Sequence, residues 1–106
     1  MGDGRLGDSM GVQTGIVQKT LTQSRQWSDP IELKDKANLG IRGTWQGTIT
    51  IQRSFDGGDT WESLPTTFTS NTQRLLNLGK HAGVLYKIGF ANGGWTSGTA
   101  YVTLTV

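Results

Sequence analysis

Apolar and polar residues alternate along several short stretches of this chain, which predicts β-strands. The alternation is clear in residues 44–54, where Trp45, Ile49 and Ile51 share one parity and polar residues occupy the other. Side chains two positions apart lie on the same face of a strand. Two later stretches, 82–94 and 96–106, alternate in the same way. Their apolar positions are Val84, Tyr86, Ile88 and Phe90, then Ala100, Val102, Leu104 and Val106. No segment shows convincing helical spacing, so we expect an all-β fold.

Weaker extended patterns fill the gaps between these strands. Residues 15–23 and 26–34 read as extended, and residues 37–45 carry two glycines that predict a bend. Residues 73–79 fit either a short strand or a helical turn. About seven or eight short strands separated by turn signals are typical of a β-sandwich or barrel. We predict a single β-sandwich, jelly-roll or Ig-like, over residues 26–106.

Residues 1–25 differ from the rest of the chain and predict an extended, glycine-rich N-terminal arm. Glycines recur through it, Gly11 among them, and apolar residues are sparse. Such a segment cannot bury enough apolar surface to fold alone. We therefore expect it to lie on a neighbouring subunit, with Ile16, Val17 and Leu21 as apolar anchors. The alternative is that it folds back on its own domain.

Composition narrows the class of protein. Glycine makes up 16 of 106 residues, and charged residues are 17%. Abundant Gly and Thr suit short strands joined by tight turns, and the absence of cysteine excludes disulfides and thiolate metal sites. A net charge of +2 is too small to indicate nucleic-acid binding. No apolar run has the length of a membrane span, and no signal-peptide pattern is present. We expect no nucleic acid, no membrane and no cofactor.

Residues 53–63, RSFDGGDTWES, contain the pattern S-x-D-x-G-x-T-W. Its glycines permit the positive φ angles of a tight turn, and its aspartate can accept hydrogen bonds from turn N–H groups. We predict a structural hairpin built by Ser54, Asp56, Gly57, Gly58, Thr60 and Trp61. The pattern resembles the Asp-box of sialidases and related propeller glycosidases. The motif is structural in those enzymes, and 106 residues are too few for a propeller. The resemblance therefore implies a turn and no activity.

The rest of the sequence matches no catalytic or metal-binding motif. Asp56 and Asp59 flank two glycines, but two carboxylates fall short of the six to eight oxygens that calcium takes. His81 is the only histidine, and we predict that it lies in a loop. No G-x-S-x-G nucleophile motif and no recognisable catalytic carboxylate pair is present. We expect a protein that is not an enzyme and holds no metal.

The four tryptophans are the most informative single residues. Trp95 lies in NGGWTSG, between glycines, and is the best candidate for an exposed ring that contacts a sugar or a protein partner. Trp27 is a second candidate contact. The alternative is that Trp45 and Trp61 fill a small core while Trp27 and Trp95 cover its ends.

Residues 44–64 and 83–106 resemble small β-sandwich proteins encoded among bacteriophage virion genes. The similarity is carried by the segments Gly47–Trp61, Ala82–Gly89 and Ser97–Leu104. It implies a non-enzymatic capsid decoration or cement protein that binds and stabilises the shell. A head–tail connector or tail protein is the first alternative, and a carbohydrate-binding module using Trp95 is the second. The implied partners are the phage major capsid protein or neighbouring virion subunits. We expect repeated copies or a homo-oligomer in the phage particle, after synthesis in the host cytoplasm.

Overall fold

A computed structural model of the chain describes residues 15–80 and 82–106, which form one antiparallel sheet of seven strands. The strands are β1 (Ile16–Leu21), β2 (Gln26–Trp27), β3 (Ile31–Glu32), β4 (Lys36–Ser54), β5 (Glu62–Phe68), β6 (Thr72–Asn77) and β7 (Leu85–Thr105). The predicted all-β class is confirmed for these residues. They include no helix that is long and apolar enough to cross a membrane.

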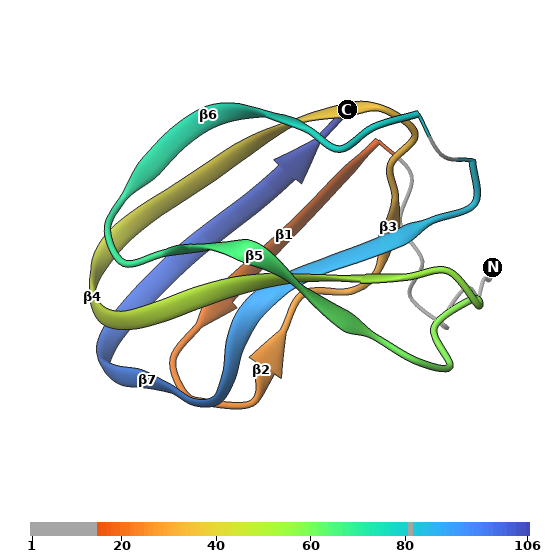
Figure 1. The fold of residues 1–106 in the computed structure, drawn as a ribbon. Helices are drawn as coiled ribbons and strands as arrows, with labels where there is room; N and C mark the ends of the chain where they lie inside the picture. Colours follow the sequence, from red (N-terminus) through yellow and green to blue (C-terminus); the bar gives the residue numbers. More distant parts are fainter. Residues whose placement is uncertain (1–14, 81) are drawn as a thin grey trace, which may run out of the picture.

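The long strands β4 and β7 organise the sheet, because they pair with each other from one end to the other. The pairing begins with Asn38 opposite Thr105 and ends with Ser54 opposite Leu85. The register shifts around Gly47, where β7 contains extra residues. Such irregularities bend a strand, and Figure 1 shows both strands curving sharply. Each long strand therefore contributes to two parts of the sheet.

We call these parts the terminal half and the hairpin half. The terminal half contains β1, β6 and the segments of β4 and β7 formed by residues 36–46 and 97–105. The hairpin half contains β2, β3, β5 and the segments formed by residues 47–54 and 85–95. In each half, the two long strands lie in the centre and the short strands lie at the edges.

One cluster of buried apolar side chains lies inside the folded sheet and joins the two halves. The terminal half supplies Val17, Leu21, Leu39, Ile41, Val102 and Leu104, and the hairpin half supplies Ile31, Ile49, Ile51, Tyr86, Ile88 and Phe90. Burial of each such side chain contributes about 1.5–3 kcal/mol to folding. The predicted alternation in the last strand is confirmed through Leu104. Val106 departs from it and is 67% exposed.

The predicted bend at residues 37–45 is wrong, because these residues belong to β4 and pair with β7. One of the two glycines, Gly43, allows close strand packing there. A Cβ at Gly43 would lie only 2.4 Å from the Thr99 carbonyl oxygen, and Gly43 has a φ of 109°. Of the two alternatives for residues 73–79, the structure shows the strand, β6.

The predicted boundary of the arm also changes, because residues 16–21 form β1 and pair with β7 through all six residues. Val17 and Leu21 are 4% and 0% exposed in the chain's own core. The predicted role of these two side chains as anchors on a neighbour is contradicted, because their packing inside the fold leaves them no surface. Ile16 remains 44% exposed. Gly11 and the rest of residues 1–14 lie outside the described residues.

Candidate functional site

The hairpin between β4 and β5 is a closed network of hydrogen bonds. Ser54, the last residue of β4, donates from Oγ to Asp56 Oδ1 at 2.7 Å and accepts from the Gly58 N–H at 2.8 Å. Asp56 Oδ1 also accepts from the Thr60 N–H at 2.9 Å, and Asp56 Oδ2 accepts from Thr60 Oγ1 at 2.5 Å. The structure thus brings together the side chains that the motif predicts.

This network gives Asp56 a structural role in the turn. The hydrogen bond from the Thr60 side chain, followed by that from the Thr60 backbone and that from Ser54, lowers the pKa of Asp56 to about 2. Gly57 and Gly58 have φ angles of 76° and 103°, which favour glycine. Both oxygens of Asp56 already accept hydrogen bonds. Within the described ranges, no group of three or more His, Cys, Asp or Glu could hold a metal ion.

The hairpin also positions Trp61 on the outward surface of the hairpin half. Trp61 Nε1 donates to the Gly58 carbonyl oxygen at 3.1 Å. The Lys87 ammonium lies 4.4 Å from the centre of the Trp61 ring and 4.9 Å from the centre of the Trp27 ring. We call these three residues the tryptophan–lysine cluster. Its members come from β2, β7 and the residue that precedes β5.

The strand pattern explains why Lys87 points outward and meets Trp27. Lys87 lies between Tyr86 and Ile88, which are both buried in the core. Trp27 pairs with Gly89, where an added Cβ would lie 2.1 Å from the Gln26 carbonyl oxygen. The glycine therefore lets β2 approach β7 closely and places Trp27 next to Lys87.

Lys87 is a partly buried cation held by aromatic rings. Burial lowers the pKa of its ammonium group. A cation over an indole face is stabilised by about 0.5–2 kcal/mol. Across residues 15–80 and 82–106, no carboxylate lies in ion-pair contact with Lys87, whereas Arg53 Nε lies 2.6 Å from Glu62 Oε1. The cluster thus presents a positive charge without an anionic partner in this part of the chain.

Two polar side chains lie beside the cluster on the same outward face. Gln52 pairs with Lys87 across the strands and with Ser63 on its other side. Gln52 Nε2 donates to Ser63 Oγ at 3.1 Å. The bond leaves the Gln52 carbonyl oxygen and the Ser63 hydroxyl proton as further hydrogen-bonding groups.

The other two tryptophans close the core near the bend of the long strands. Trp45 packs edge-on against Phe90, with ring centres 5.7 Å apart, and Trp95 is partly buried against the same core. Trp95 Nε1 donates to the Gly98 carbonyl oxygen at 3.0 Å. This matches the alternative in which Trp95 covers an end of the core. Trp61 lies outside the core cluster, so its predicted place in the core is wrong.

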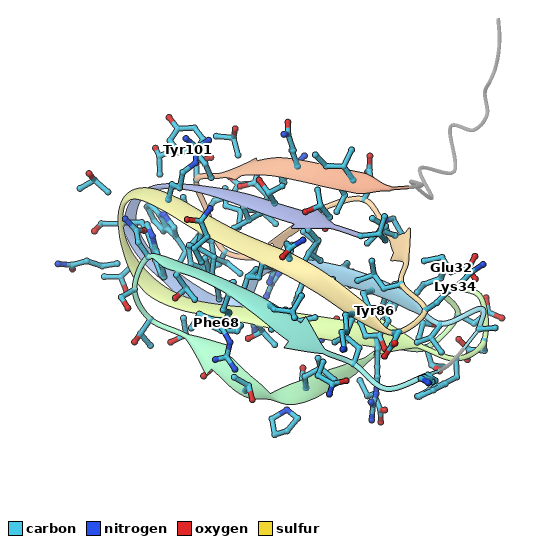
Figure 2. The ribbon with its side chains drawn as sticks, turned by 90° about the horizontal axis from the view of Figure 1, so that it is seen from above. Glu32, Lys34, Phe68, Tyr86 and Tyr101 are labelled. Atoms are coloured by element: carbon cyan, nitrogen blue, oxygen red, sulfur yellow. The ribbon has the colours of Figure 1, made fainter. Side chains whose placement is uncertain are left out.

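The outward surface of the terminal half, which we call the terminal face, is a second candidate site. Leu75 and Ile16 lie at the two ends of one cross-strand row and are 56% and 44% exposed. Tyr101 also points outward (Figure 2). An open depression of about 870 Å³ lies over Gly40. Its lining includes Asn38, Arg42, Gln73, Leu75, Thr103 and Thr105.

Sequence reasoning missed Lys87, Gln52 and Ser63. The available signal was a lysine at an outward position of an apolar strand, in LYKIGF. His81 falls outside the described residues. No protein-family model matches the chain, and no curated protein matches it.

Proposed function

We propose that the protein is a non-enzymatic structural component of a bacteriophage virion, a decoration or cement protein that binds and stabilises the capsid. The resemblance of residues 44–64 and 83–106 to small virion proteins supports the proposal. The folded sheet is compatible with it. We propose further that the terminal half and the hairpin half are the two layers of a β-sandwich.

The terminal face is the observation that carries the proposal. It combines exposed apolar side chains, Ile16, Leu75 and Tyr101, with an open depression lined by both polar and apolar residues. Apolar and aromatic groups set among polar neighbours are typical of protein–protein interfaces. An attached capsid subunit would bury these apolar groups and hydrogen-bond the polar lining.

The N-terminal segment would add to the same contact. The Val106 N–H donates to the Gly15 carbonyl oxygen at 2.9 Å, so the chain reaches β1 beside the C-terminal end of β7. This position borders Ile16 on the terminal face. Residues 1–14 contain several glycines, which allow a backbone to lie close against another surface. The proposed capsid contact therefore consists of the terminal face and this segment.

The test is co-sedimentation of the full chain with capsids that lack it. Leu75→Lys replaces an exposed apolar side chain of the proposed contact by a charge, and we expect binding to fall about 30-fold, the effect of losing a strong interface residue. Thr67→Lys adds the same charge on exposed β5 in the hairpin half and serves as the matched control. Deletion of residues 2–14 should also weaken binding. Full capsid binding by Leu75→Lys would overturn the proposal. Binding to isolated tails alone would favour the tail alternative.

A further inference from the structure

We propose that the tryptophan–lysine cluster is a binding site for an acidic sugar, with Lys87 receiving the carboxylate of a uronic acid. The cluster belongs to the hairpin half and faces away from the core, whereas the terminal face belongs to the other half. The site is therefore separate from the proposed capsid contact and does not depend on it.

The charge of Lys87 is the first argument. Its ammonium is partly withdrawn from water beside two indole rings, and within the described chain it has no carboxylate in ion-pair contact. Partial burial disfavours the charged form. An arriving carboxylate would compensate, because a hydrogen bond between two charged groups is roughly twice as strong as a neutral one. The site thus selects a ligand with a negative charge.

The rings are the second argument. Trp27 and Trp61 are both only partly buried, so part of each side chain beside the ammonium remains open to solvent. A flat aromatic surface packs well against the apolar C–H face of a pyranose ring. A small inorganic anion would use Lys87 and leave this surface uncovered. The two rings therefore favour an acidic sugar over a bare phosphate or sulfate.

The polar neighbours are the third argument. The Gln52 carbonyl oxygen can accept a hydrogen bond, and the Ser63 hydroxyl can donate one. Both side chains lie on the outward face next to Lys87 in the strand register. Sugar hydroxyl groups are donors and acceptors at once, so they match this pair.

The site is also built before any ligand arrives. The Trp61 ring is fixed to the hairpin through its hydrogen bond with Gly58, and Trp27 is set by the close approach of β2 at Gly89. A preorganised site loses less conformational entropy on binding. The fixed rings therefore favour recognition of a sugar unit.

The experiment titrates the full chain with trigalacturonic acid and, separately, with its methyl ester, which has the same rings but no charge. Tryptophan fluorescence and the indole N–H signals in NMR report binding. We expect the acid to bind about tenfold or more tightly than the ester, the effect of one charged hydrogen bond. We expect the Trp27 and Trp61 signals to shift and those of Trp45 and Trp95 to stay in place.

Lys87→Met removes the charge and keeps most of the hydrocarbon stem, and it should lose the preference for the acid. Lys36→Met, at an exposed position of β4 in the terminal half, is the matched control and should bind as wild type does. Trp27→Phe provides a second variant if Lys87→Met fails to fold, and it should weaken both ligands. Thermal melting of each variant checks folding.

Three results would overturn the proposal. They are no shift of the Trp27 and Trp61 signals at millimolar sugar, equal affinity for acid and ester, and equal shifts produced by inorganic phosphate alone. Capsid co-sedimentation of Lys87→Met should remain at the wild-type level. Failure of the sugar site is thereby distinguishable from failure of the proposed capsid role.

Discussion

Asp56 is exposed to solvent, yet its carboxylate is the centre of the hairpin. Hydrogen bonds from Thr60 and Ser54 stabilise the ionised form, and they lower its pKa from 3.8 to about 2. A carboxyl group with a lowered pKa in the folded state stabilises the fold fully above its unfolded pKa. This contribution is lost as the pH falls from about 4 through about 2. Part of the protein's stability therefore depends on the ionised form of Asp56 and is lost at acidic pH.

The first prediction concerns this dependence. Asp56→Asn should lower the urea midpoint at pH 7, because the charged acceptor of the turn is lost. Between pH 5 and pH 2 the variant should lose less stability than wild type does. Asp59→Asn removes a charge from the same turn, and Asp59 makes no side-chain hydrogen bond within the described chain, so it should behave as wild type. Identical acid profiles for wild type and Asp56→Asn would contradict the assignment.

The second prediction concerns Gly89. Gly89→Ala would place a methyl group 2.1 Å from the Gln26 carbonyl oxygen and 2.8 Å from Trp27 Cα. The backbone of β2 must then move, and we expect a loss of about 1–3 kcal/mol in the free energy of unfolding. Gly40→Ala is the control, since its nearest atom, Thr103 Cβ, is 3.9 Å away. Chemical denaturation of both variants measures the difference. A fully stable Gly89→Ala would show that β2 is loosely attached.

At the scale of elements, local patterns predicted strands but not their lengths or partners. Alternation within 44–54 and 82–106 was visible in the sequence, because it depends only on neighbouring residues. The continuity of β4 was not visible in the sequence, since Gly40 and Gly43 are usual signs of a bend. Their place within a strand depends on pairing with β7. The hairpin was predictable because its hydrogen bonds are made within its own motif. The tryptophan–lysine cluster joins residues 27, 61 and 87, so no local pattern reveals it.

The third prediction tests the place of β1 in the sheet. Leu21→Ala removes a side chain that is 0% exposed and should cost about 2–5 kcal/mol of unfolding free energy. Ile16→Ala, in the same strand but 44% exposed, should cost much less. Equilibrium unfolding of the isolated protein measures both. Equal and small effects would indicate that residues 16–21 belong to a loosely held arm, as the sequence suggested.

For the whole molecule, the main consequence of the fold is that the two ends of its described part, Gly15 and Val106, lie side by side. The Val106 N–H donates to the Gly15 carbonyl oxygen at 2.9 Å, beside the first pair of β1 and β7. The two halves of β7 pair with different segments of β4 on either side of the bend. We therefore expect the sheet to form from the same strand pairs even when the strands are joined in a different order along the chain.

The fourth prediction follows from this arrangement. We expect a circular permutant that links Val106 to Gly15 and opens the chain between Asn92 and Gly93 to fold cooperatively. These two residues of β7 are exposed and lie where its pairing with β4 is interrupted, and exposed, unpaired backbone tolerates new ends. A permutant opened between Gly40 and Ile41 is the control. It should fail to fold, since that point lies within β4 and is paired on both sides. Circular dichroism and urea unfolding distinguish the two, and an unfolded first permutant would refute the prediction.

The long pairing of β4 with β7 also affects the rate of folding. Asn38 meets Thr105, so the central ladder forms only after a large loop of chain has closed, and closing a loop costs entropy. All-β domains dominated by such distant pairs fold in roughly milliseconds to seconds. The hairpin at Asp56 is local and can form within about microseconds. During refolding, we therefore expect an intermediate in which β4 and β5 have formed their hairpin while the other edge of β4 is still unpaired. A low protein concentration should raise the refolding yield, because β7 of the same chain can then pair with β4 before another chain does.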